Sequence, residues 1–171
     1  MKQPVAPNPT HILGVDPGLA GALCLLSIQT KAIEGVFDMP TSDGQVDPTK
    51  LAAIVDLLNF QANRHIHAAV ELVGSMPRQA GAFNFGRSAG VVHGVLGALN
   101  IPMTMVSPNV WKPAMGLRRG LNESQAQNKI RARELAVRLW PEQAGLFARV
   151  KDDGRAESAL LARHFINSKG W

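Results

Sequence analysis

The first apolar run of the chain ends in an acidic turn, and this arrangement limits how the chain can begin to fold. Residues His11–Val15 form a short apolar run that predicts a buried strand, and Asp16 follows it directly. The next residues, Pro17–Gly21, are rich in proline and glycine, which supply the backbone angles of a turn. A second apolar run, Ala22–Ile28, then predicts the partner strand of a β-hairpin.

Later runs predict a mixed sheet flanked by helices. Asp47 followed by Pro48 is typical of a helix start, and apolar residues recur after it at helical spacing. The further expected strands are Ala32–Met39, His67–Leu72 and Met103–Val106; the expected helices are 48–63, Gly86–Leu99, one from Asn122 or Ser124 to about Trp140, and one from Asp152–Gly154 to about Asn167; the expected loops are Thr41–Gln45 and Ser107–Leu121. Three antiparallel strands followed by β-α-β units give a five-stranded α/β sheet with helices on both faces. This order is similar to the ribonuclease H-like fold, in which the fourth strand lies beside the central first strand, so that Asp16 and Glu71 become neighbours.

The predicted helix Gly86–Leu99 carries closely spaced glycines. Gly90, Gly94 and Gly97 each lower helix propensity by about 1 kcal/mol relative to alanine. We expect them to allow close approach of this helix to the sheet or to a partner subunit, and the helix is our candidate for a dimer face.

The length of the chain fits one domain. Its 171 residues are expected to form a single domain over residues 11–171 after a flexible leader of residues 1–10.

The charge of the chain favours an anionic partner. The formal net charge of +5 is typical of proteins that bind nucleic acid. No acidic residue lies between Glu71 and Glu123, although five lysines and arginines do. A stretch with charges of one sign differs from an ordinary solvated surface, which mixes both signs.

Cysteine content and hydropathy indicate a cytoplasmic protein. Cys24 is the single cysteine, so no intramolecular disulfide can form, which suits a reducing compartment. No run approaches the roughly 18 apolar residues that a membrane helix requires, and the N-terminal residues lack the apolar core of a signal peptide. We therefore expect no membrane partner.

Four carboxylates fall at positions where this topology can gather them. Asp16 follows the first strand, Glu71 closes the fourth, and Asp153 and Glu157 are four residues apart at the start of the last helix, which puts them on one face. Two Mg²⁺ or Mn²⁺ ions need several hard oxygen ligands to act on a phosphodiester. We expect Asp16 to bridge the two ions and the other three carboxylates to complete the site.

Each acid also has a simpler interpretation. Asp16 can be an ordinary turn residue, and Glu71 can mark the exposed end of a buried strand. Asp152 or Asp153 can be the N-cap of the last helix, which does not exclude metal binding. The combination of all four is much less expected by chance than any one of them.

Together these residues resemble a known family, the RuvC-type Holliday-junction resolvases, and most closely the compact phage-associated branch. The segments that carry the resemblance are Gly14–Gly18, Val70-Glu71, Ser75–Gln79, Phe83–Gly86, Pro108–Lys112 and Asp153–Glu157. The resemblance runs from about Ile12 to His164. It implies a homodimeric endonuclease that nicks opposed strands of four-way DNA junctions, leaving 5′-phosphate and 3′-hydroxyl ends.

One departure from the family pattern leaves the third ligand open. The family commonly has Asp-His-Gly-Arg-Ala-Asp/Glu, whereas this chain has a second aspartate in place of the histidine. Helical geometry favours Asp153 as the ligand, and alignment with the aspartate of the pattern favours Asp152. We select Asp153, with Asp152 as the alternate.

Basic and aromatic residues are the candidates for DNA binding. Phosphate contacts dominate such affinity, and aromatic rings can stack on unpaired bases. The candidates are Arg78, Phe83, Phe85, Arg87, Lys112, Arg118, Arg119, Lys129, Arg131 and Arg133. We expect Phe83 and Phe85 on the loop after Glu71, where they stack on bases or pack under the next helix, and we expect Trp111 to anchor the loop that carries Lys112.

Three alternative functions remain. A ribonuclease H-like nuclease that processes RNA fits the basic stretch equally well. A sugar-kinase or actin-like ATPase domain shares the acid-glycine hairpin, but this chain is short for a two-lobed ATP cleft and has no later glycine-rich phosphate loop. A catalytically silent junction-binding module does not explain the intact set of acids.

Overall fold

The computed structural model describes residues 8–72 and 82–171. Within these residues the main sheet has five strands in the order β3-β2-β1-β6-β7. Their bounds are β1 (His11–Val15), β2 (Ala22–Ser27), β3 (Ile33–Asp38), β6 (Ile66–Glu71) and β7 (Met103–Val106). The predicted loop after β3 contains a small hairpin of β4 (Thr41–Ser42) and β5 (Gln45–Val46).

The sheet is mixed, as predicted. β1 pairs antiparallel with β2 and parallel with β6, β2 pairs antiparallel with β3, and β6 pairs parallel with β7. β1 is therefore central, and the fourth expected strand lies beside it. In the register of these two strands Val15 faces Val70, so Asp16 and Glu71 come next on adjacent strands.

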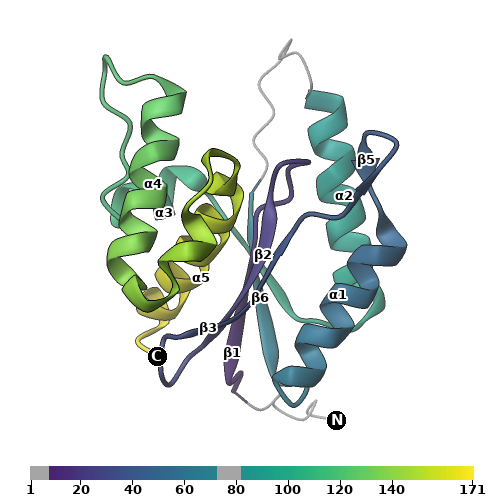
Figure 1. Cartoon of the computed structure of the whole chain (residues 1–171). Helices are drawn as coiled ribbons and strands as arrows, with labels where there is room; N and C mark the ends of the chain where they lie inside the picture. The colour runs from purple at the N-terminus through teal and green to yellow at the C-terminus, as the bar shows by residue number, and fades with distance from the viewer. Residues whose placement is uncertain (1–7, 73–81) are drawn as a thin grey trace.

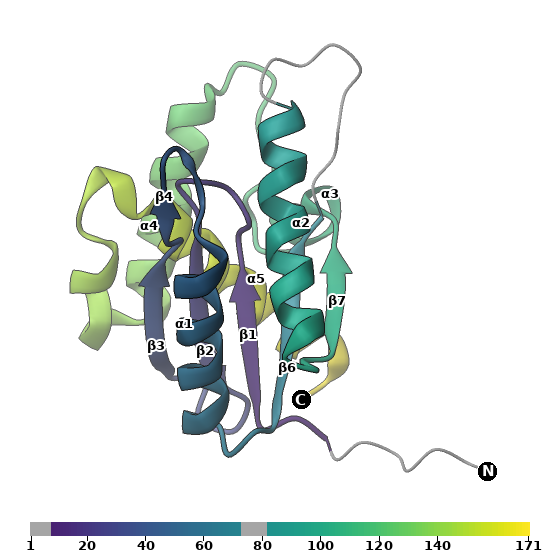
Figure 2. The same cartoon turned by 90° about the vertical axis from the view of Figure 1, so that its right-hand side faces the viewer.

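Helices cover both faces of the sheet, which confirms the predicted architecture. One face carries α1 (Pro48–Gln61) and α2 (Ala82–Ala98), and the other carries α3 (Pro108–Ala114), α4 (Gln125–Leu139) and α5 (Asp153–Lys169) (Figure 1). Two short 3₁₀ segments, η1 (Pro141–Phe147) and η2 (Val150–Asp152), connect α4 to α5. Figure 2 shows α1 and α2 in front of the strands and α4 and α5 behind them. No helix in residues 8–72 and 82–171 combines the length and apolar character of a membrane span.

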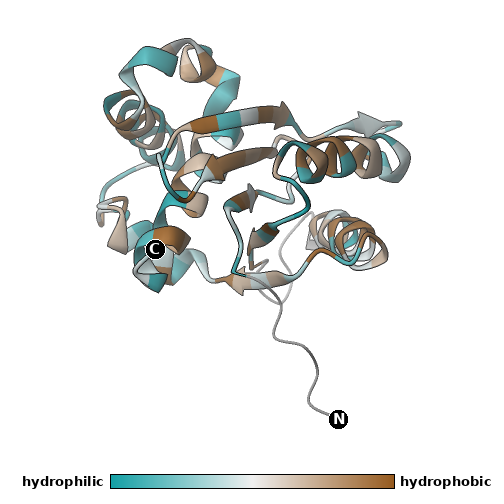
Figure 3. Ribbon diagram, turned by 90° about the horizontal axis from the view of Figure 1, so that it is seen from below, coloured by the Kyte–Doolittle hydropathy of each residue, from teal (hydrophilic) through white to brown (hydrophobic). Residues whose placement is uncertain are grey.

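The core has two layers because the central strands bury both of their faces. Ile12 and Cys24 pack toward α5, whereas Leu13 and Leu25 pack toward α1. Alternation along a strand sends successive side chains to opposite faces. The strands accordingly show much of the apolar colour in Figure 3. Cys24 is fully buried, as its apolar run predicted.

Two predicted helix starts are confirmed by their caps. The Asp47 side chain accepts hydrogen bonds from the backbone N–H of Thr49 and Lys50, both at 3.0 Å, and Pro48 occupies the first position of α1. Ser124, one of the two expected caps, begins α4 in a capping box with Gln127. Such caps satisfy N–H groups that have no partner inside the helix.

Two expectations about loops are wrong. Part of the segment Ser107–Leu121 is helical, because Ser107 caps α3 and Pro108 fits its first turn. α2 begins at Ala82 and not at Gly86, so Phe83 and Phe85 lie in the first turn of a helix and not on a loop. The glycine at position 86 obscured this start in the sequence.

The glycines of α2 do not bring that helix close to the sheet. An added Cβ at Gly90, Gly94 or Gly97 would meet no atom within 4 Å, so these positions face away from the rest of the described chain. The close approach occurs instead between β1 and α5. A Cβ on Gly14 would lie 2.0 Å from the carbonyl oxygen of Ser158, which excludes any side chain there.

Candidate active site

The carboxyl ends of β1 and β6 bring the first two acids together. The parallel register ends with Val15 beside Val70, and Asp16 and Glu71 follow at the same edge of the sheet. The backbone N–H of Gly18 donates to Asp16 Oδ1 at 3.1 Å, so the turn after β1 holds this carboxylate. Both acids thus lie at the ends of two adjacent, directly paired strands.

The first turns of α5 bring the other two acids to the same edge. Gly154 allows this approach, because a Cβ there would lie 2.3 Å from the carbonyl oxygen of Ala20 in the turn after β1. Asp153 and Glu157 lie one helical turn apart on α5, as expected. The helix start and the Asp16 turn are therefore packed directly against each other.

These four acids line one cavity of about 380 Å³. Its walls come from the turn after β1, the end of β6, and the helices α2, α3, α4 and α5. The residues that line it are Asp16, Gly18, Ala20, Gly21, Glu71, Phe85, Lys112, Gln125, Asn128, Lys129, Asp153 and Glu157. We call this space the carboxylate cavity.

Burial and neighbouring negative charge disfavour the ionised forms of the two strand acids, Asp16 and Glu71. Burial raises the pKa of Asp16 to about 6, and the nearby charge of Glu157 adds to the shift. Burial also raises the pKa of Glu71 to about 7; Lys112 opposes this rise, and Asp16 reinforces it. Crowded, partly desolvated carboxylates favour protonation unless a cation joins them. A divalent cation would relieve this repulsion.

Trp111 holds Glu71 from α3. Its indole is fully buried, and Nε1–H donates to Glu71 Oε2 at 2.9 Å. The sequence predicted only that Trp111 anchors the segment carrying Lys112, and that segment is helix α3. The bond to Glu71 was missed, because the two residues are 40 positions apart in the sequence.

The two helix acids are each paired with a lysine. Lys112 Nζ lies 2.9 Å from Glu157 Oε2, and Lys129 Nζ lies 2.5 Å from Asp153 Oδ2. Burial opposes the charge of Lys112, but the carboxylates of Glu157 and Glu71 outweigh it and raise the lysine pKa above its ordinary value. The cavity therefore combines four acids with two ammonium groups.

The ligand chemistry of this cavity fits divalent cations. Carboxylate oxygens are the ligands that Mg²⁺ and Mn²⁺ prefer, and four of them line one space. However, no three His, Cys, Asp or Glu side chains within residues 8–72 and 82–171 are arranged closely enough to hold one ion. Two of the four carboxylates point to lysines instead. An ion bound through Glu157 Oε2 or Asp153 Oδ2 would have to displace Lys112 or Lys129 from that oxygen.

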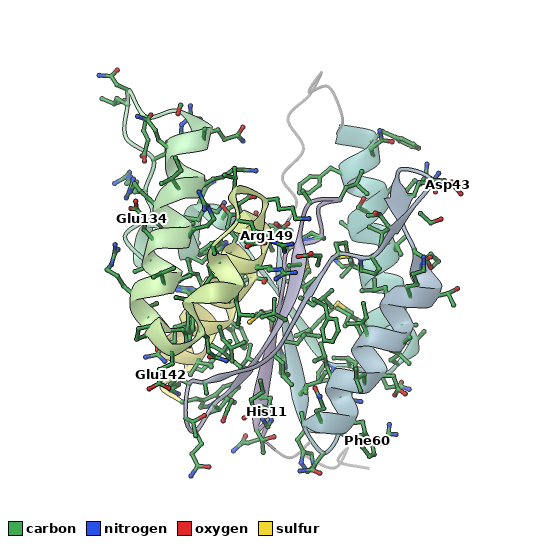
Figure 4. The ribbon with its side chains drawn as sticks, in the orientation of Figure 1. His11, Asp43, Phe60, Glu134, Glu142 and Arg149 are labelled. Carbon is green, nitrogen blue, oxygen red and sulfur yellow. The ribbon has the colours of Figure 1, made fainter. Side chains whose placement is uncertain are left out.

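Asp152, the alternate ligand, lies in a different network. Its carboxylate is buried and accepts hydrogen bonds from Arg149, at 2.8 Å from the backbone N–H and 2.7 Å from Nη2. Burial raises the pKa of Asp152, but these bonds outweigh it and hold the pKa below its ordinary value. Arg149 lies beside the start of α5 (Figure 4), and Arg155 binds Asp38 on β3 with two bonds. This network fixes the start of α5, and Asp152 does not line the carboxylate cavity.

The structure places the DNA-binding candidates in different surroundings. Phe85, Lys112 and Lys129 line the carboxylate cavity, and Arg118 and Arg119 line a neighbouring groove. Phe83 and Arg87 are exposed on α2, away from this lining. Arg78 lies outside the described residues.

The two remaining arginine candidates are bound inside the subunit. Arg131 binds the carboxylate of Glu123 at 2.7 and 2.8 Å and the carbonyl oxygen of Gly116. Arg133 donates to the carbonyl oxygen of Arg149 at 3.3 Å. Both hold neighbouring segments in place, which the sequence did not reveal.

The sheet order, the two helical layers and the acids at the strand ends define a ribonuclease H-like fold, as predicted. Similar solved structures support this assignment. Thermus thermophilus RuvC matches with a TM-score of 0.59 and 17% identity, over 93% of this chain and 96% of that one. RuvC of the same organism in complex with a Holliday junction substrate matches with a TM-score of 0.57 and 16% identity, over the same shares of both chains.

A third similar structure comes from yeast. The mitochondrial Holliday junction resolvase Ydc2 matches with a TM-score of 0.50 and 20% identity, over 96% of this chain and 82% of that one. No protein-family model and no curated protein matches the sequence. At these identities the likeness establishes the fold.

Proposed function

We propose that this protein is a metal-dependent endonuclease that resolves four-way Holliday DNA junctions by symmetric phosphodiester hydrolysis. The observation that carries the proposal is the carboxylate cavity, in which acids from β1, β6 and α5 meet beside two lysines. Both the fold and the names of the similar structures agree with it. The products would be nicks with 5′-phosphate and 3′-hydroxyl ends, which a ligase can seal.

Asp16, Glu71, Asp153 and Glu157 would hold two Mg²⁺ ions, with Mn²⁺ able to substitute. Bound ions of this kind supply an activated water and neutralise charge on the leaving oxygen. Asp16 interacts electrostatically with both helix acids, since the charges of Glu157 and Asp153 each raise its pKa. It is therefore our candidate for the shared ligand.

The remaining cavity residues would hold the DNA. Lys112 and Lys129 would move from the carboxylates to phosphate oxygens once cations replace them, so that the charge of the cavity stays balanced. Phe85 lines the cavity beside the turn after β1, since a Cβ added at Gly18 would lie 3.4 Å from its ring, and this position suits stacking on an unpaired base. Trp111 would keep Glu71 in the orientation that a cation needs.

Symmetric cleavage requires two sites, and we propose a homodimer formed through α2. The outward Gly90, Gly94 and Gly97 leave a smooth helix face that a second helix can approach closely. Sedimentation equilibrium tests this proposal: a mass of twice 18.4 kDa supports it, and a monomeric mass at all concentrations contradicts it. The buried Cys24 fits a protein of the reducing cytoplasm, where we place it.

One cleavage assay tests the function. The purified protein is incubated in Mg²⁺ with a labelled four-way junction, a linear duplex of the same sequence and an RNA hairpin. We expect paired nicks in the junction and intact linear duplex. Preferential cleavage of the RNA hairpin would support an RNA-processing nuclease instead, and absence of any cleavage in Mg²⁺ or Mn²⁺ would contradict a nuclease function.

A further inference from the structure

A second polar groove adjoins the carboxylate cavity and contains the DNA-binding candidates Arg118 and Arg119. It lies between α3 and α4 and has a volume of about 460 Å³. The polar and charged side chains that line it are Asn109, Lys112, Arg118, Arg119, Gln125 and Asn128. We call it the α3–α4 groove; no acidic side chain is among its described lining residues.

The groove continues directly from the carboxylate cavity. Lys112, Gln125 and Asn128 line both spaces. Lys112 is bound to Glu157 on the cavity side, so one ammonium group stands between the acids and the groove. A polyanion that leaves the cavity on this side enters the α3–α4 groove. There it meets arginines and amides, and no carboxylate among the described lining residues repels it.

The backbone around the groove is held by side-chain hydrogen bonds, whereas the side chains of Arg118 and Arg119 are exposed. Asn128 Nδ2 donates to the carbonyl oxygen of Leu117 at 3.0 Å, which joins α4 to the segment after α3. Arg131 adds bonds to the carbonyl oxygens of Gly116 and Arg118. Within the described residues, neither Arg118 nor Arg119 forms an ion pair, and both are exposed. Arg119 Nε donates to the carbonyl oxygen of Glu123 at 2.7 Å, which leaves its terminal N–H groups without a bond to the described residues, and the Arg118 side chain forms no hydrogen bond to them. Their charges are therefore available to a ligand.

We infer that the α3–α4 groove binds the phosphodiester backbone of the DNA strand that adjoins the scissile phosphate. This inference rests on the nuclease function proposed above. Arginine guanidinium groups bind phosphate oxygens through two parallel bonds, and the amides of Asn109 and Gln125 add neutral donors. The volume of about 460 Å³ fits a short length of one strand. The groove therefore sets the path of the cleaved strand.

Removal of one arginine tests the contact. Arg118→Ala is compared with Arg138→Ala, an exposed arginine near the other end of α4, in junction binding measured without cleavage in EDTA over a series of salt concentrations. Loss of a phosphate contact lowers affinity by about tenfold for Arg118→Ala. It also reduces the salt slope by about 0.7 to 0.9. The Arg138→Ala protein should match the unchanged protein, and equal affinities and slopes for both variants would overturn the inference.

Disulfide trapping tests the position of the strand. The single native cysteine is buried, so Asn109→Cys adds the one exposed thiol, and Val110→Cys adds an exposed control thiol just outside the groove lining. Each is mixed with a junction whose backbone carries a tethered thiol within a few nucleotides of the cut. The Asn109→Cys protein should trap this DNA several times faster, and equal trapping by both would contradict the strand path.

Cleavage by the unchanged protein separates the two possible failures. If it nicks junctions in Mg²⁺ but the two pairs of variants do not differ, the groove inference alone is wrong. If it does not cleave any nucleic acid, the nuclease proposal is wrong, and a remaining difference between Arg118→Ala and Arg138→Ala would still support strand binding in the groove.

Discussion

The two sides of the carboxylate cavity differ in how their charges are balanced. On the strand side, Asp16 and Glu71 accept hydrogen bonds from a backbone N–H and an indole, which are neutral donors. On the helix side, Asp153 and Glu157 each pair with a lysine. The strand acids accordingly have raised pKa values, to about 6 and about 7. The strand acids thus have no direct ion pair within the described residues, and burial favours their neutral forms, whereas each helix acid is held by a lysine that a metal cation would have to displace.

The largest expected effects come from removing one acid on either side. Asp16→Asn and Glu157→Gln should each abolish junction cleavage in Mg²⁺, because both sides are needed to hold the cations. Junction binding should survive, since phosphate contacts dominate it. Gel assays of binding and cleavage check both effects, with Glu134→Gln on the outer side of α4 as the control (Figure 4). Cleavage retained by either variant would refute that acid as a ligand.

The neighbouring aspartates Asp152 and Asp153 should separate stability from chemistry. Asp153→Asn should remove most cleavage and leave the melting temperature nearly unchanged. Asp152→Asn leaves the contact between this buried side chain and Arg149 incomplete and should reduce the free energy of unfolding by about 1 to 3 kcal/mol. Denaturant unfolding and cleavage rates measured on both proteins check this contrast. The opposite pattern would make Asp152 the ligand.

Loss of one indole should produce an intermediate effect. Trp111→Phe removes the donor to Glu71 and keeps most of the packing, and we expect cleavage and Mn²⁺ affinity to decrease by about 10- to 100-fold. Trp140→Phe is a matched control, because its Nε1–H donates at 2.8 Å to the carbonyl oxygen of Lys31, away from the cavity. Mn²⁺ binding followed by electron paramagnetic resonance distinguishes a positioning role from lost stability. Equal Mn²⁺ affinity for both variants would argue against a positioning role for Trp111.

The smallest effect concerns pH and the metal-free fold. Because the folded-state pKa of Asp16 is raised to about 6, the stability that its neutral form provides is present below about pH 4 and lost as pH rises through about 6. Asp16→Asn keeps the side chain neutral and should raise the melting temperature at pH 8 by about 2 to 4 °C. The gain should disappear near pH 4. Thermal unfolding scans in EDTA check this, with Asp43→Asn at an exposed position as the control (Figure 4). An equal gain in melting temperature at pH 8 and pH 4 would contradict the prediction.

The sequence predicted those strands and helices whose apolar pattern and end residues indicate the same element. The alternation of apolar runs and the cap at Asp47 gave the strands and α1, and the parallel register then follows from the strand order. α3 was missed because Pro108 and Pro113 lie within seven residues, a pattern that is typical of loops although Pro108 here starts a helix. The outward glycines of α2 were also ambiguous, since spacing alone does not tell which side of a helix faces the sheet.

Within the site, the sequence predicted the four acids but not their partners. The choice between Asp152 and Asp153 as the ligand depends on Arg149. This arginine binds Asp152 across the short 3₁₀ segment η2. The bond from Trp111 to Glu71 and the pairing of Lys129 with Asp153 join distant parts of the chain, so no local pattern encodes them. Such contacts exist only after the sheet and helices have packed.

Anomalous diffraction from crystals grown with Mn²⁺ tests whether the strand acids and the helix acids hold metal ions together. Release of both lysines would allow the strand and helix acids to share ions, so we predict two peaks about 3.5 to 4 Å apart, each contacted by carboxylates from both sides of the cavity. Lys112 and Lys129 should no longer contact Glu157 and Asp153. A map without Mn²⁺ among Asp16, Glu71, Asp153 and Glu157, with both lysine pairs intact at saturating Mn²⁺, would contradict a metal site at these four acids.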